Sequence, residues 1–133
     1  MTLYIDSSAV LKRYFEEEDS TEAIDMMGTD PVMVISPLVE VEVHRNLALH
    51  LDGERLEEAR YRFTLELDGF AIVPLDAQVC AEAARIAEQT LCRSLDAIHL
   101  AAARRAGPAT TVLTFDQRRA QAARSIGLSA IGC

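Results

Sequence analysis

Leu3-Tyr4-Ile5-Asp6-Ser7-Ser8 is the segment, close to the N-terminus, that constrains the fold most strongly. Its three apolar residues form a run too short and too evenly apolar for a surface strand, which predicts a central strand buried on both faces. A helix is expected to begin directly after it, with Ser7 or Ser8 as its N-cap. Asp6 is thereby placed at the carboxyl end of a buried strand.

Short apolar runs and helical patterns alternate along the rest of the chain. Further strands are predicted at residues 32–35, 70–75, 111–115 and 128–131. Helices are predicted at residues 20–27, 37–50, 54–67, 77–90, 95–105 and 116–125. Strands that alternate with helices form a parallel sheet with helices on both faces. We therefore expect a single α/β domain over residues 1–133.

The charge of the chain limits its function class. Twenty-one acidic and 13 basic residues leave a formal net charge of −8, which repels a polyanion at long range and argues against a general nucleic-acid coat. A nucleic-acid substrate would have to be bound locally, through cations or arginines. Lys12 is the only lysine, and the arginines suit bidentate contacts to carboxylate or phosphate.

The three cysteines, Cys80, Cys92 and Cys133, indicate neither a disulfide framework nor a structural zinc site, because the sequence has no CxxC pair and no histidine at zinc-finger spacing. The first residues pass directly into the predicted strand without a basic leader. No apolar run approaches the roughly 18 residues of a membrane span. We therefore expect a cytoplasmic protein with no membrane association.

Four carboxylates lie inside or beside apolar segments, where they are desolvated unless a partner compensates them, and the chain offers few obvious partners. They are Asp6, Glu42, Asp96 and Asp116. Asp6 and Asp116 each follow a predicted strand, and ligands of open parallel sheets bind beyond the carboxyl ends of the strands. Asp96 is the second residue of its helix if Ser94 is the cap, and that helix is apolar on nearly all sides and hence buried.

The helix after the second strand offers two acids, Glu40 and Glu42. They lie about 200° apart on the helical wheel, so only one of them can face the other carboxylates. Glu42 has Arg45 and Asn46 three and four residues further on, whereas Glu40 has apolar residues there. We favour Glu42 because of these polar neighbours.

Carboxylates packed together repel one another and take up protons unless a divalent cation compensates their charge. Oxygen-only ligands select hard ions such as Mg²⁺ or Mn²⁺. Such a site can orient and deprotonate water for in-line attack on phosphorus. The cluster therefore predicts metal-dependent phosphodiester hydrolysis.

Each acid also has an ordinary structural role that the sequence leaves open. Asp6 and Asp116 are placed to cap helices, Asp96 to interact with the dipole of its own helix, and Glu42 to pair with Arg45.

Other polar residues carry weaker signals. His44, His50 and His99 lack metal-ligand spacing and are expected to be structural. Two arginine pairs, Arg104-Arg105 and Arg118-Arg119, could either contact RNA phosphates or be ordinary surface charges, and we favour surface charges.

Four motifs follow one another along the chain. They are Tyr4-Ile5-Asp6-Ser7-Ser8-Ala9, Ser36-Pro37-Leu38-Val39-Glu40-Val41-Glu42-Val43-His44-Arg45, Ser94-Leu95-Asp96-Ala97-Ile98-His99-Leu100-Ala101 and Leu113-Thr114-Phe115-Asp116. Together, and over essentially the whole chain, they resemble the PIN-domain ribonucleases, and among these the VapC-type toxins of toxin–antitoxin pairs.

The resemblance implies a three-layer α/β/α sandwich with a central, mainly parallel sheet of four to five strands, and Mg²⁺- or Mn²⁺-dependent endonucleolytic cleavage of RNA. Asp6 and Asp96 match the family's principal metal ligands, and Glu42 and Asp116 its remaining catalytic acids. Thr114 matches a hydroxyl position beside the acids, and Ser7 is grouped with it as a supporting residue. The sequence departs from the family in an additional acid, Glu40, two residues before the expected one.

The resemblance also implies partners. Family members commonly form homodimers, and the C-terminal segment of a cognate antitoxin lies across the acidic cleft, often with a basic side chain. A net charge of −8 suits such a basic segment better than free RNA. The substrate is then expected to be recognised by shape, as in a structured RNA such as a hairpin or a tRNA loop.

Two other functions remain in competition. A phosphoryl-receiving signalling domain also places acids at strand ends, but it needs a lysine near the phosphorylated aspartate, and Lys12 follows the wrong strand. A catalytically silent PIN-like module would bind RNA or a protein partner without cutting, and it would differ from the nuclease in lacking Mn²⁺ binding.

Overall fold

A computed structural model describes residues 1–29 and 32–133. Within these residues, five strands form one sheet in the order β3-β2-β1-β4-β5, and every neighbouring pair is parallel. The strands are β1 (Thr2–Ile5), β2 (Val32–Ile35), β3 (Ala71–Ile72), β4 (Thr110–Leu113) and β5 (Ser129–Ile131). The strand order reverses between β1 and β4, because the chain leaves β1 toward β2 and returns on the other side.

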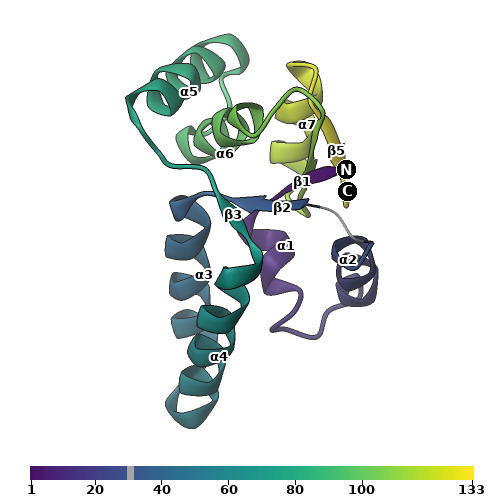
Figure 1. Cartoon of the computed structure of the whole chain (residues 1–133), viewed down its shortest axis with the longest axis vertical. Coiled ribbons are helices and arrows are strands. Elements are labelled where there is room, and N and C mark those ends of the chain that lie inside the picture. The colour runs from purple at the N-terminus through teal and green to yellow at the C-terminus, as the bar shows by residue number, and fades with distance from the viewer. Residues whose placement is uncertain (30–31) are drawn as a thin grey trace.

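Helices cover both faces of this sheet (Figure 1). The helices are α1 (Ser7–Leu11), α2 (Ser20–Met27), α3 (Pro37–His50), α4 (Gly53–Glu66), a 3-10 turn η1 (Leu67–Gly69), α5 (Ala77–Thr90), α6 (Ser94–Arg105) and α7 (Gln117–Ser125). Helices α5, α6 and α7 lie on one side of the sheet, and α1, α3 and α4 lie on the other. The predicted three-layer α/β/α sandwich with a parallel sheet is confirmed.

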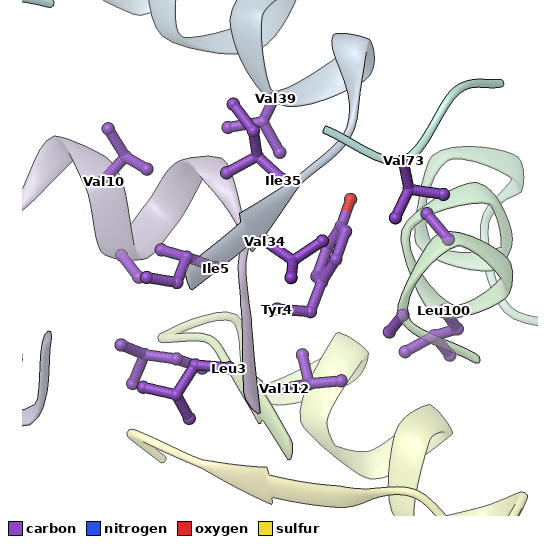
Figure 2. Close-up of a cluster of buried hydrophobic side chains, with 14 of the residues drawn as sticks. Leu3, Tyr4, Ile5, Val10, Val34, Ile35, Val39, Val73, Leu100 and Val112 are labelled. Carbon is purple, nitrogen blue, oxygen red and sulfur yellow. The ribbon is translucent and has the colours of Figure 1, made fainter. Parts of the chain in front are cut away.

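The central strand β1 is buried on both faces, as its apolar run predicts. Leu3, Tyr4 and Ile5 are all fully buried. Figure 2 shows Leu3 and Ile5 on the side of Val10 in α1, whereas Tyr4 lies on the opposite side, where Val73 and Leu100 also lie. Because successive side chains of a strand alternate between faces, this one strand joins both layers of the core.

Several details differ from the sequence-based expectations, among them the end of β4 at Leu113 and not at residue 115. The first helix is capped by Asp6, which was one of the open alternatives, and not by Ser7 or Ser8, because the Asp6 carboxylate accepts a hydrogen bond from the backbone N–H of the third helical residue. Helix α6 begins one residue earlier than expected and has Arg93 at its N-cap, so Asp96 is its third residue.

A further difference concerns the strands at and near one edge of the sheet. Strand β3 has two residues, not the predicted six, and Pro74 follows it without an N–H to donate to a neighbour. Strand β2 is buried only in its second half, with Val32 exposed.

In the part of the chain that the structure describes, no helix combines the length and apolar character needed to span a bilayer.

Candidate active site

The four predicted acids come from four different elements. Asp6 directly follows β1 and Asp116 lies three residues after β4, the two strands between which the strand order reverses. Glu42 comes from α3 and Asp96 from the first turn of α6. Parallel sheets bind ligands at this topological position.

Asp6 is fully buried, and each oxygen of its carboxylate accepts two hydrogen bonds. Oδ1 accepts from Ser8 Oγ at 2.6 Å and from the backbone N–H of Ala9 at 3.0 Å. Oδ2 accepts from Thr114 Oγ1 and from Arg119 Nη1, the latter at 2.6 Å. Asp6 is therefore both a helix cap and a charged member of the site, so the two roles coincide.

Asp96 is only 1% exposed and is held by two guanidinium groups. Its Oδ1 accepts from Arg119 Nε at 2.9 Å, and its Oδ2 accepts from Arg93 Nε at 2.8 Å. Arg93 is half exposed, whereas Arg119 is buried. Asp6 and Asp96 thus share the buried guanidinium of Arg119.

Asp116 caps α7, as one of the open alternatives expected. Its Oδ1 accepts from the backbone N–H groups of Arg118 and Arg119, and its Oδ2 accepts from Arg93 Nη2 at 2.8 Å. Burial alone would raise the pKa of the Asp116 carboxyl, but the backbone N–H of Arg119 and the guanidinium of Arg93 bring that pKa below its ordinary value.

Glu42 is the acid of α3 that faces the site. Its Oε1 accepts from Ser7 Oγ at 3.3 Å and is hydrogen-bonded to His99 Nε2. Burial raises the pKa of the Glu42 carboxyl, but the contact with His99 and the charge of Arg119 outweigh it, and the pKa lies below its ordinary value. Glu42 contacts His99 instead of pairing with Arg45, which is exposed.

The contact of His99 with the site was not predicted from the sequence. This side chain is fully buried, and besides Glu42 it contacts the Tyr4 hydroxyl, which lies 2.8 Å from Nδ1. The Tyr4 hydroxyl is in turn 2.9 Å from Ser36 Oγ. A buried chain of hydrogen bonds therefore runs from Ser36, across the central strand, to the carboxylate of Glu42.

The expectation that the acids have few partners is wrong. Arg93 and Arg119 lie among the carboxylates, and neither was assigned to the site from the sequence. For Arg119 the preferred interpretation as surface charge is also wrong, since only 5% of the residue is exposed. Lys12, in contrast, pairs with Glu17 and Asp19, away from the acids.

A cleft of about 390 Å³ opens onto this group. Its lining comes from α1, α3, α6, α7 and the residues that cap them: Ser7, Ser8, Leu11, Glu42, Asn46, Arg93, Ser94, Leu95, Asp96, Asp116 and Arg119. Asp6 is not part of this lining, and Arg119, which lines the cleft, is hydrogen-bonded to it.

The donor set consists of carboxylate and hydroxyl oxygens, which is the kind of set that Mg²⁺ and Mn²⁺ prefer. Across residues 1–29 and 32–133, however, no three carboxylate, thiol or imidazole groups are arranged so that they could hold one ion together. The guanidinium groups of Arg93 and Arg119 bridge the acids instead. The residue types fit a hard divalent cation, and the arrangement is one in which arginines supply the positive charge.

Comparison with known proteins agrees with this geometry. The family model of the PIN domain matches residues 3–125. Ribonuclease VapC47 of Mycobacterium tuberculosis is 36% identical over 94% of this chain and 92% of that protein. Ribonuclease VapC46 of the same species is 35% identical over 97% of this chain and 95% of that protein. The chain therefore belongs to the PIN domain family, within which it groups with the VapC ribonucleases.

Solved structures share the fold at lower identity. The FitAcB structure from Neisseria gonorrhoeae has a TM-score of 0.78 at 21% identity, covering 98% of this chain and 97% of that chain. A toxin–antitoxin complex from Klebsiella pneumoniae has a TM-score of 0.74 at 15% identity, covering 99% and 97%. These structures support the observed architecture along almost the entire chain.

Proposed function

We propose that this protein is a metal-dependent endoribonuclease, the toxin of a toxin–antitoxin pair. The observation that carries the proposal is the convergence of four acids at the carboxyl edge of the sheet, in a chain 36% identical to a VapC ribonuclease. Three of the four carboxylates pair with the guanidinium groups of Arg93 and Arg119, and Glu42 contacts His99. Four carboxylates and two guanidinium groups have a formal charge of −2, which a divalent cation can compensate.

In this proposal Asp6 and Asp96 are the principal ligands of Mg²⁺ or Mn²⁺, and Glu42 and Asp116 complete the site. The ion, when bound, supplies activation of the attacking water and offsets the charge that builds on the phosphate. Thr114 fixes the orientation of the Asp6 carboxylate by donating to Oδ2, and Ser7 donates to Glu42 in the same way. Both hydroxyls therefore support the acids and do not act as nucleophiles.

The proposed partners follow from charge and from the family. The acid-rich cleft and a net charge of −8 favour a cognate antitoxin that brings a basic side chain to the site. The similar Klebsiella pneumoniae structure is a toxin–antitoxin complex. We further propose that the protein forms a homodimer in the cytoplasm. We also propose that its substrate is a structured RNA, such as a tRNA loop, because a loop exposes bases and phosphates that a protein can bind with a small number of contacts.

The direct test is an RNA cleavage assay with the purified full chain, free of antitoxin. We expect cleavage of a tRNA pool at defined positions with Mg²⁺, loss of cleavage with excess EDTA, and its return when Mn²⁺ is added. Calorimetry should show Mn²⁺ binding. Cleavage that survives the chelator would contradict the metal dependence, and absence of both cleavage and Mn²⁺ binding would favour the silent binding module.

The two acids of α3 provide a matched pair of variants. We expect Glu42→Gln to lower the cleavage rate by roughly 10- to 100-fold, because the acid that faces the cleft loses its charge. Glu40→Gln removes the same charge from the same helix and should leave the rate within about twofold. The cleavage rates of both variants are measured as initial rates with RNA in excess. A larger loss of cleavage rate in Glu40→Gln than in Glu42→Gln would show that Glu40, and not Glu42, is the acid of this helix that serves the site.

A further inference from the structure

Arg119 is a buried cation fixed at the centre of the acid cluster. It is the third residue of α7, and its backbone N–H donates to the carboxylate of Asp116, which caps that helix. Its guanidinium then reaches two other acids: Nη1 lies 2.6 Å from Asp6 Oδ2, and Nε lies 2.9 Å from Asp96 Oδ1. Arg119 therefore contacts three of the four acids.

Burial of this guanidinium is compensated by the acids. Burial alone would lower the pKa of Arg119, but the charges of Asp6 and Asp96 raise it above its ordinary value, so the side chain stays charged. The same contact compensates Asp6 and Asp96, whose buried carboxylates would otherwise repel each other. The three groups thus stabilise one another in the folded chain.

Arg119 bonds to one carboxylate oxygen of each of the two proposed principal metal ligands. Asp6 Oδ1 is already committed to the cap of α1, where it accepts from Ser8 and Ala9. Asp6 Oδ2 is bridged to Asp96 Oδ1 by the guanidinium of Arg119, which bonds to both oxygens. Arg93 also bonds to both oxygens of Asp96, at 2.8 Å to Oδ2 and 3.3 Å to Oδ1, but its side chain is half exposed, whereas that of Arg119 is buried.

We propose that Arg119 is an internal counter-cation that competes with the divalent ion for Asp6 Oδ2 and Asp96 Oδ1. Arg119 is thus a positioning residue: it holds the two acids together without the ion, and it weakens the affinity for the ion because the guanidinium must leave these oxygens first. This inference rests on the metal site of the proposed function.

The test compares Arg119→Gln with Arg118→Gln, using calorimetry with Mn²⁺. Arg118 is the preceding residue and is exposed, so its variant removes the same charge without touching Asp6 or Asp96. We expect the Mn²⁺ dissociation constant to fall by at least about tenfold in the Arg119 variant and to change by no more than about threefold in the Arg118 variant. Equal or weaker Mn²⁺ binding by Arg119→Gln would overturn the proposal.

A second readout is thermal unfolding with and without Mn²⁺. Arg119→Gln should melt at a lower temperature than the unsubstituted protein in EDTA. Mn²⁺ should raise the melting temperature of the variant by more than that of the unsubstituted protein, because stabilisation by a ligand grows with the logarithm of its concentration over Kd. Equal melting temperatures of Arg119→Gln and the unsubstituted protein in EDTA would overturn the proposed role of Arg119 in holding the acids together.

If Arg119→Gln does not fold, the Mn²⁺ affinity of Arg119→Lys is the deciding measurement, since a lysine keeps the charge but cannot bridge two acids as the planar guanidinium does. Tighter Mn²⁺ binding by that variant supports the proposal, and unchanged or weaker binding overturns it.

Failure of this inference is distinguishable from failure of the proposed function. Mn²⁺ binding by the unsubstituted protein, combined with unchanged affinity in the Arg119 variant, rejects the competition and keeps the metal site. Lack of Mn²⁺ binding by both proteins rejects the metal site itself, and the inference with it.

Discussion

Asp6→Asn should reduce RNA cleavage by at least about 100-fold while the protein remains folded. Asparagine has nearly the same shape as aspartate and is an equally good helix N-cap, so α1 keeps its cap through the contact to Ala9. The negative charge that faces Arg119 and Thr114 is lost, however. The variant thus keeps the capping role of Asp6 and removes its charge, which serves both the proposed metal binding and the ion pair with Arg119.

The measurement is the initial rate of cleavage of a structured RNA with Mg²⁺, alongside circular dichroism and the Mn²⁺ affinity. Asp25→Asn is the matched control, because Asp25 is exposed on α2 and loses the same charge. We expect the control to keep its rate within about twofold. Full activity in Asp6→Asn would show that Asp6 does not hold a catalytic ion, and the nuclease assignment would fail at its principal residue.

The acids were predictable from the sequence because their positions follow from local patterns. Asp6 and Asp116 directly follow apolar runs, and the rule that parallel sheets bind ligands at their carboxyl edge brings them together without knowledge of side chains. Glu42 was favoured over Glu40 because of its polar neighbours Arg45 and Asn46, of which Asn46 lines the same cleft and Arg45 is exposed. Helical periodicity and strand ends thus contain enough information to locate the carboxylates.

The arginines and the histidine were not predicted because their partners are distant in sequence. Arg119 and Asp6 are 113 residues apart, and His99 and Glu42 are 57 apart, so no spacing rule connects them. A weaker signal was available for each. Arg119 lies three and four residues before Ala122 and Ala123, which places it on the buried face of α7.

His99 had a comparable signal. It lies three residues after Asp96 on a helix that is apolar nearly all round, so it shares a face with a predicted site acid. The hydrogen-bond directions in its network follow from chemistry. When Glu42 is ionised and His99 is neutral, Nε2 donates to Glu42 and Nδ1 accepts from the Tyr4 hydroxyl, whose oxygen then accepts from Ser36.

His99→Leu should lower both stability and turnover. Leucine fills much of the volume but leaves Glu42 without its buried donor, and we expect a loss of about 1–3 kcal/mol in the free energy of unfolding. For a domain of this size that corresponds to a melting temperature lower by roughly 5–15 °C. The kcat for RNA cleavage should fall about 10- to 100-fold, because a freed Glu42 no longer keeps its orientation at the cleft.

A loss of stability alone does not distinguish positioning from packing, so the kinetic constants and a conservative variant decide. KM should stay nearly unchanged, since buried His99 acts through Glu42 and has no exposed surface to offer the RNA. His99→Gln restores an N–H that can donate to Glu42, and we expect it to recover part of kcat without recovering all of the stability. His44→Leu, at an exposed position of α3, is the control and should keep kcat. If His99→Leu and His99→Gln are equally active, Glu42 is oriented by Ser7 and the helix alone, and the buried chain from Ser36 serves only to hold the two layers of the core together.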